Sequence, residues 1–468
     1  MRIFIPLCIF LLPFLVEAQN PNDYDSDLLP ASFHKERREA FRKLMDSNSV
    51  AFFFTNPVRQ RANDVEYVYH QDPNFYYMTG YTEPNAVLVL FKNKIILDSI
   101  STNEIIYVQP RNPSDESWEG RRLGVAGVQS KLGFEYVFEN TSFQDLKLDY
   151  NRFKKIYYPY SYNDVRDDPY NEGDLFSLMK IFAKQTEKFK EKKDYVGLFT
   201  RCAQLRETKT SQEMKLLRKA VDISVEGHLQ LMRNLKTGMK EFQAQALVEF
   251  GFKFNGAEFE GYPSILGGGE NSCILHYVTN RKKLNNQDFL VCDAGAEYHG
   301  YTADITRTLP TDGKFSETEK TIYNIVLEAQ DAGFKACQNN NSFRAPHNAA
   351  VEIIKKRLKE IGVISNEEEY INYFFHGTSH YLGLDVHDPG MNGKLKPGQV
   401  ITVEPGIYIP EGSPCDKKWW NIGVRIEDDV LITGGEPEIL SGKLPRTIPE
   451  IEKIMENASN FINLPSEK

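Results

Sequence analysis

The chain has 468 residues, of which 41% are hydrophobic and 26% are charged, which is typical of a globular protein with two or three domains. Its net charge of −9 argues against a nucleic-acid partner, because phosphate backbones bind basic faces and the sequence has no arginine-rich stripe. A chain of this length and composition can bury a sizeable core.

The first eighteen residues differ from all that follow. Arg2 precedes an almost unbroken apolar run over residues 3–16, and the run ends in Val16-Glu17-Ala18. These features are typical of a secretory signal peptide, and the run is shorter than the ~20 residues of a membrane span. We therefore expect residues 1–18 to be a signal peptide, the mature chain to have no stable membrane span, and the protein to be exported, either to a periplasm or out of the cell. An uncleaved anchor is the alternative.

The residues up to about 200 are predicted to form an α/β domain, which we place at residues 27–200. Ser32 can cap a first helix. Residues 71–85 combine aromatic side chains with turn residues and predict a packed loop. Strands separated by helices favour an α/β layer. The apolar runs that predict strands lie at residues 50–54, 86–91 and 105–108.

A second domain is predicted at residues 201–460. Its helices are marked by start and stop signals. Thr210 with Glu213, and Ser316 with Glu319, form capping boxes ahead of apolar residues at helical spacing, and two further helices are predicted at residues 239–250 and 346–361. The acids and histidines that carry chemistry lie in the strands and loops between these helices.

Two aspartates flank a predicted hairpin in this domain. An apolar strand ends at Asp293, the chain turns through glycines, and it returns to Asp304. Two ionised carboxylates held close together repel each other, so one of them must have a raised pKa unless a cation lies between them. The alternative is that Asp293 caps a turn and Asp304 is merely exposed.

Three of the nine histidines fall within twelve residues, at positions 376, 380 and 387. Such a density of His376, His380 and His387 is typical of metal binding or proton transfer. Further along, an apolar strand ends at Glu404, directly before Pro405. A buried, unpaired acid at that position is costly, so Glu404 is expected to need a cation.

Residues 423–429 alternate as in a strand, which places Arg425 and Glu427 on the same face. Four carboxylates and one imidazole suit two divalent cations of intermediate hardness, first Mn(II), with Co(II) or Zn(II) also compatible. A pair of such ions ~3.5 to 4 Å apart can activate water and polarise a carbonyl, so we expect hydrolysis of an amide or ester. The expected donors are Asp293, Asp304, His380, Glu404 and Glu427.

The motifs around these residues resemble those of a known family. CDAG, YTADITRT, HGTSHYLGLDVHD, TVEPGIYI and VRIEDD follow one another in the order seen in aminopeptidase P, the Xaa-Pro aminopeptidase family with the pita-bread catalytic fold. The likeness includes VEYVYHQDPNFYYMTGYTEPNAVLVLF at residues 65–91 and covers about residues 30–455. It implies an N-terminal α/β domain followed by a C-terminal pita-bread domain. It also implies removal of the N-terminal residue from peptides with proline in second position, and a homodimer or homotetramer.

The resemblance also implies a role for each site residue. One metal is bound by Asp293, the other by His380 and Glu404, and both by Asp304 and Glu427. Glu404 also lies near the attacking hydroxide, and His387 hydrogen-bonds the substrate near its scissile carbonyl. His276 stabilises the tetrahedral intermediate, His376 lines the proline side, and Arg425 orients Glu404 or neighbouring groups. For His276 and His376 an internal, hydrogen-bonded histidine is the alternative.

Two other functions remain open. A prolidase shares the metal ligands but cleaves only dipeptides, and the likeness of the N-terminal domain favours the aminopeptidase. A pita-bread binding module without catalysis is the second alternative, and such a module has no reason to retain five ligands. Residues 411–420 look like an insertion between two motifs and are expected to reshape the site entrance.

Overall fold

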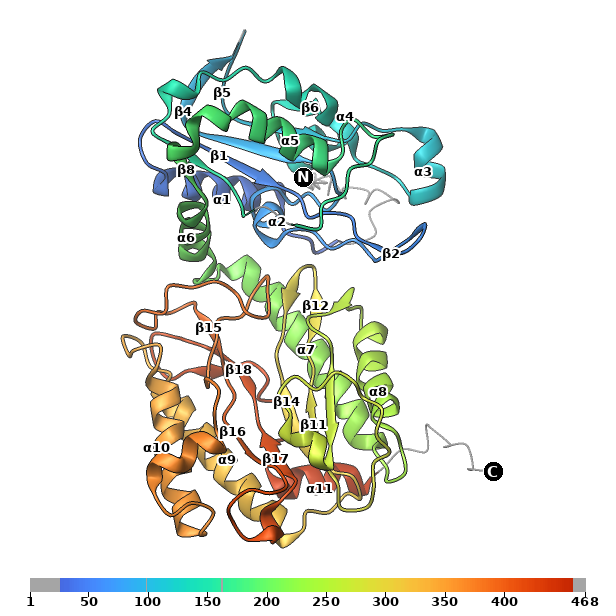
Figure 1. Ribbon diagram of the computed structural model, residues 1–468, viewed down its shortest axis with the longest axis vertical. Helices are drawn as coiled ribbons and strands as arrows, with labels where there is room; N and C mark the ends of the chain where they lie inside the picture. Colours follow the sequence, from blue (N-terminus) through green and yellow to red (C-terminus); the bar gives the residue numbers. More distant parts are fainter. Residues whose placement is uncertain (1–25, 98, 161–162, 458–468) are drawn as a thin grey trace, which may run out of the picture.

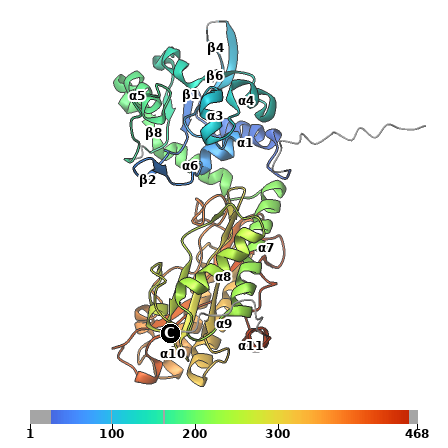
Figure 2. The same cartoon turned by 90° about the vertical axis from the view of Figure 1, so that its right-hand side faces the viewer.

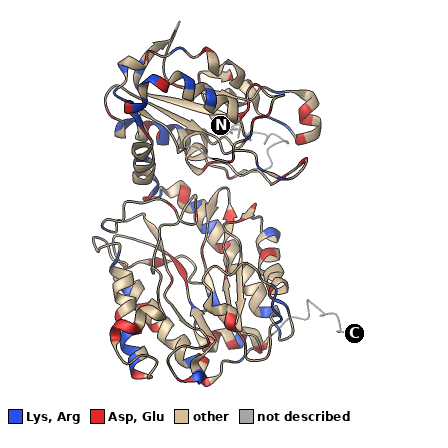
Figure 3. Cartoon of the chain, in the orientation of Figure 1, with Lys and Arg blue, Asp and Glu red and all other residues tan. Residues whose placement is uncertain are grey.

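The computed structural model describes residues 26–97, 99–160 and 163–457. The predicted signal peptide lies outside these residues. Within the described ranges, none of the helices combines the length and apolar character that a membrane crossing requires. Figure 1 shows two bodies, one from each half of the chain, joined by helix α6 (Tyr195–Arg206), which spans the predicted boundary near residue 200. Basic and acidic residues are interspersed over both bodies (Figure 3).

The first body is an α/β layer built on a six-stranded sheet in the order β6-β5-β4-β1-β7-β8. The three predicted strands are confirmed as β1, β4 and β5, of which β4 pairs antiparallel with each of the other two. The sheet strands are β1 (Ser49–Phe54), β4 (Val87–Leu97), β5 (Ile100–Val108), β6 (Val137–Glu139), β7 (Lys155–Tyr157) and β8 (Lys193–Asp194). The helices beside the sheet are α1 (Ala31–Leu44), α2 (Pro73–Thr79), α4 (Gly124–Leu132) and α5 (Leu175–Gln185).

Helix α2 corrects the prediction of a loop at residues 71–85. Asp72 caps the helix by accepting a hydrogen bond from the Phe75 N–H, Pro73 occupies the first turn, and Gly80 ends the helix with a φ of 70°. Phe75 and Tyr77 are fully buried. The helix therefore forms because its short start and stop signals frame a turn whose aromatic side chains join the core.

The second body holds short strands between two helix pairs. Helices α7 (Ser211–Asn234) and α8 (Glu241–Phe254) pack on one group of strands. Helix α9 (Glu317–Ala336) packs on the other, and α10 (Ala345–Glu360) packs against α9 (Figures 1 and 2). Both predicted capping boxes are present. The first strand group contains β9 (Phe259–Glu260), β10 (Ile265–Gly268), β11 (Phe289–Asp293), β12 (Ala296–Tyr298), β13 (Tyr301–Thr302) and β14 (Thr306–Pro310). The second contains β15 (Val400–Val403), β16 (Gly406–Ile409), β17 (Ile422–Arg425), β18 (Asp428–Leu431) and β19 (Glu438–Ile439).

The single strand predicted at residues 423–429 is wrong, because it divides into β17 and β18. Strand β17 pairs with β16, and β18 pairs with β15. Pro405 separates β15 from β16, and a proline has no N–H to donate to a neighbouring strand. The ladder of hydrogen bonds between the two antiparallel segments is therefore interrupted at Pro405 and at the residues that face it.

Candidate metal centre

One cavity of about 580 Å³ in the second body is lined by all of the site residues predicted from the sequence. They are Asp293, Asp304, His380, Glu404, Glu427, His276, His376, His387 and Arg425. Residues 411–420, all of which are described, contribute no side chain to this lining, and their effect on the site entrance stays a prediction. The cavity lies where the two strand groups meet.

Two antiparallel pairings place the four carboxylates. Val403 pairs with Asp428 and Gly406 with Arg425, so the register continues across the interruption and places Glu404 opposite Glu427. In the other pairing, Asp293 faces Thr306, which lies two residues after Asp304, so the two aspartates are diagonal neighbours on one face. The chain approaches itself closely here, since a Cβ on Gly295 would lie 1.8 Å from the Ala303 carbonyl oxygen.

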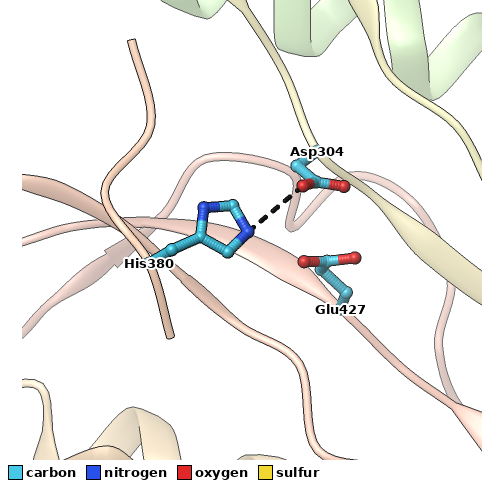
Figure 4. Close-up of side chains that lie close together, drawn as sticks. All are labelled: Asp304, His380 and Glu427. Atoms are coloured by element: carbon cyan, nitrogen blue, oxygen red, sulfur yellow. Dashed lines mark ion pairs between the residues drawn. The ribbon is translucent and has the colours of Figure 1, made fainter. Parts of the chain in front are cut away.

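The imidazole of His380 completes the donor set. Its Nε2 lies 3.3 Å from an oxygen of Asp304 and 3.6 Å from an oxygen of Glu404. One donor atom each from Asp304, His380 and Glu427 lie within 4.8 Å of one another, and Figure 4 shows the ring facing both carboxylates. The His380 Nδ1 lies 3.0 Å from the carbonyl oxygen of Tyr381, a contact that leaves Nε2 toward the acids.

The carboxylates perturb one another strongly. Burial and the charge of Asp293 raise the pKa of Asp304 well above its usual range, and burial and the charge of Asp304 do the same for Glu427. Burial and the charge of Glu427 raise the pKa of Glu404 to about 8. The prediction that one of the two close aspartates must have a raised pKa without a cation between them is confirmed for Asp304. The five donors therefore fit divalent cations, whose positive charge would let all four carboxyl groups ionise.

Tyr262 is a site residue that the sequence analysis missed. Its hydroxyl lies 2.5 Å from an oxygen of Asp293 and 2.5 Å from an oxygen of Asp304. One hydroxyl proton can serve only one of these oxygens, so the second contact needs a proton on the carboxyl group, consistent with the raised pKa of Asp304. No motif marks this residue, because a lone tyrosine before a proline is common in loops.

Arg425 hydrogen-bonds groups other than Glu404, which the prediction named first. Its Nη2 donates to an oxygen of Asp293 at 2.6 Å, and its Nη1 donates to the Tyr408 hydroxyl at 2.9 Å. Both Arg425 and Tyr408 are buried. The arginine thus orients Asp293 rather than Glu404, and Tyr408 links Arg425 to His376.

The other three histidines lie around the carboxylates. His376 Nε2 lies 2.9 Å from the Tyr408 hydroxyl, and burial together with the charge of Arg425 lowers the pKa of His376 to about 4. The rings of His380 and His387 are perpendicular, with centroids 4.5 Å apart. His276 is exposed at the cavity wall. Of the two histidines for which an internal, hydrogen-bonded position was the alternative, His376 is hydrogen-bonded within the described residues and His276 is exposed.

The comparisons with known proteins agree with this geometry. Residues 215–434 match Metallopeptidase family M24, and residues 34–157 match Aminopeptidase P, N-terminal domain. The chain is 33% identical to the Xaa-Pro aminopeptidase of Haemophilus influenzae, covering 91% of this chain and 98% of that protein. It is also 33% identical to the Xaa-Pro aminopeptidase of Escherichia coli, covering 90% and 97%.

Solved structures of the E. coli enzyme share the whole architecture. Aminopeptidase P with the inhibitor Pro-Leu has a TM-score of 0.80 at 31% identity, covering 92% of this chain and 99% of that one. A zinc-substituted form in complex with product has a TM-score of 0.80 at 30% identity, covering 92% and 100%. The predicted order of an α/β domain and a pita-bread domain is thus confirmed. The chain belongs to metallopeptidase family M24, among the aminopeptidase P proteins, and is a metal-dependent peptide hydrolase.

Proposed function

We propose that this chain removes the N-terminal residue from peptides whose second residue is proline. The observation that carries the proposal is the convergence of four carboxylates and one imidazole in a single cavity, with three of the carboxyl groups perturbed by their neighbours. The relatives named Xaa-Pro aminopeptidase, which match over nearly their full length, support the substrate class.

Two divalent cations fit the donor set. In this proposal Asp293 would hold one cation, His380 and Glu404 would hold the other, and Asp304 and Glu427 would serve both. When bound, the pair lowers the pKa of water and polarises the scissile carbonyl. Mn(II) is the proposed native ion, with Co(II) or Zn(II) as substitutes, because mixed oxygen and nitrogen donors suit cations of intermediate hardness. The zinc-substituted relative is compatible with this choice.

The side chains around the donors are proposed to bind and orient the peptide. His387 hydrogen-bonds the substrate near its scissile carbonyl, and His276 stabilises the charge that develops on that carbonyl oxygen. Glu404 would take a proton from the attacking water and return one to the proline nitrogen as the C–N bond breaks. The lowered pKa of His376 keeps its ring uncharged at neutral pH, which suits a wall beside an apolar proline ring.

Proline in second position suits a metal-activated hydroxide, which needs no hydrogen on the scissile nitrogen. The Xaa-Pro bond is a tertiary amide whose nitrogen has no hydrogen, so a protease that relies on this donor cannot bind it normally. The cavity wall also offers apolar surface for the ring. The apolar lining residues are Ile265, Leu275, Val278 and Val386.

A prolidase is the nearest alternative, because it would use the same donors on dipeptides. The N-terminal domain match at residues 34–157 supports the aminopeptidase instead. A binding module without catalysis is disfavoured, because each of the five donors is present and lines the same cavity. We further propose that the protein is exported after cleavage near Ala18 and acts as a homodimer or homotetramer.

The proposal is tested with metal-stripped protein, an Xaa-Pro-Yaa tripeptide and the matching Xaa-Pro dipeptide, each with and without added Mn(II). We expect metal-dependent release of the first residue from the tripeptide. Cleavage of the dipeptide alone would make the protein a prolidase. If neither peptide is cleaved with Mn(II), Co(II) or Zn(II), the result would contradict the catalytic proposal and favour the binding module.

A further inference from the structure

A buried ion cluster lies between the first body and the loop that carries the catalytic histidines. Asp388 accepts a hydrogen bond from Arg206 Nη2 at 2.5 Å and another from Lys209 Nζ at 3.0 Å. The exposed fractions of these side chains are 1% for Asp388, 4% for Arg206 and 1% for Lys209. Buried charges are costly unless they are paired and hydrogen-bonded, so these three groups are strongly held together.

The same cluster reaches into the N-terminal domain. Arg206 is the last residue of α6, and its Nη1 donates to Asn74 Oδ1 in α2 at 2.8 Å. Next to this contact, the Tyr77 hydroxyl donates to the Leu205 carbonyl oxygen at 3.3 Å. Helix α2 is thereby tied to the end of α6, and Arg206 at that end is tied in turn to Asp388 in the second body.

Asp388 closes the loop that positions two histidines. Its N–H donates to the Tyr381 carbonyl oxygen at 3.0 Å, and the two residues form a β-bridge. His380 precedes one bridged residue and His387 precedes the other, and their rings meet at a centroid distance of 4.5 Å. The position of His387 therefore depends on where the carboxylate of Asp388 is held.

We propose that Arg206, Lys209 and Asp388 are positioning residues for His387, and that Asn74 makes the N-terminal domain part of this support. The inference rests on the proposed function, in which His387 contacts the peptide near the scissile carbonyl. The His387 residue is exposed, so packing alone does not hold its ring. A backbone shift at Asp388 would move the imidazole away from the reacting carbonyl, and such misplacements reduce rates even without loss of contact residues.

The first body contains a matched control for this cluster. Glu104 accepts hydrogen bonds from Arg38 at 3.0 Å and from Arg42 at 2.7 Å, so one carboxylate again serves two cations. Glu104→Gln leaves two largely buried guanidinium groups without their anion. In the same way, Asp388→Asn leaves Arg206 and Lys209 without theirs. Only the Asp388 cluster adjoins the loop of His387, so the pair separates loss of stability from loss of position.

The experiment is a double-mutant cycle on the full chain, with kcat and KM for the tripeptide measured per folded protein. We expect Asp388→Asn to lower kcat about 10- to 100-fold with KM nearly unchanged, because the lost contact acts in the transition state. In a His387→Ala background, the same change should lower kcat by less than about twofold, because the two residues act as one unit. Glu104→Gln should lower the unfolding temperature and leave kcat unaltered.

Asn74→Ala provides a milder variant if Asp388→Asn fails to fold, since Asn74 is half-buried and uncharged. It should lower kcat in the wild-type background but not in the His387→Ala background. Equal losses in both backgrounds, or an equal loss in Glu104→Gln, would overturn the inference. A His387→Ala variant with unchanged kcat, or a wild-type chain that does not cleave the tripeptide, would instead contradict the proposed function. Both rates are measured before the double-mutant cycle is interpreted.

Discussion

Loading the metal centre with cations is expected to release protons. The pKa of Glu404 is about 8 without a cation, and those of Asp304 and Glu427 are also raised. With that pKa, Glu404 is about nine-tenths protonated at pH 7, against almost full ionisation of an ordinary glutamate with a pKa of about 4.3. Cations bind the ionised form, so Glu404 alone should release about 0.9 proton, and the other two acids should add to it.

The direction of the pH dependence follows from the sign of these shifts. Each released proton raises the apparent metal affinity about tenfold per pH unit. Because the pKa of Glu404 is raised, its contribution to the rise of metal affinity with pH persists up to about pH 8 and then levels off. In the metal-free protein, the same group contributes stability that is complete below about pH 4.5 and is lost as the pH rises through 8, by about 1.4 kcal/mol per pH unit.

Titration calorimetry of Mn(II) into metal-stripped protein, in two buffers of different ionisation enthalpy, measures the protons directly. Glu404→Gln should reduce the release at pH 7 by about one proton. Glu83→Gln is the matched control, because burial also raises the pKa of Glu83, which lies in the first body away from the site. An affinity that stays constant between about pH 6 and 8, or binding without proton release, would refute the reasoning.

Three further predictions concern single substitutions. Asp304→Asn or His380→Ala should abolish metal-dependent turnover while the circular dichroism spectrum stays native; near-normal rates in either variant would remove the proposed site. Tyr262→Phe should weaken Mn(II) binding about 10- to 100-fold, as loss of a group that orients metal ligands does, and unchanged binding in the same calorimetric titration would contradict its role. Ser316→Ala should cost about 1 kcal/mol in urea unfolding without changing kcat/KM, because it removes only the cap of α9.

Local signals explain which elements were predictable. The capping boxes at Thr210 and Ser316 place helix starts within a few residues, since both partners of each box lie in one turn. The hairpin after Asp293 was also predictable, because its glycines and the apolar residues that flank them lie close together in the sequence. Helix α2 was missed although Asp72 and Gly80 mark its ends, because seven residues are too few for a clear apolar period.

The interruption near Pro405 shows where local reasoning fails. Alternation over residues 423–429 indicates a strand, but it cannot show that the facing segment contains a proline. That segment follows a different helix pair and meets the strand only when the chain has folded. The same interruption leaves Glu404 opposite Glu427 and free of the regular ladder, so the departure from the prediction lies at the site itself.

The sequence by itself identified the five donors proposed for the metal centre, because each belongs to a short motif of its own and all five line one cavity. Only the tertiary structure decided how these groups are supported. Tyr262 lies 42 residues before Asp304, and Arg206 lies 182 residues before Asp388. Contacts over such separations arise from the packing of whole elements, and a side chain that supports another through them has no spacing or motif by which the sequence could reveal it.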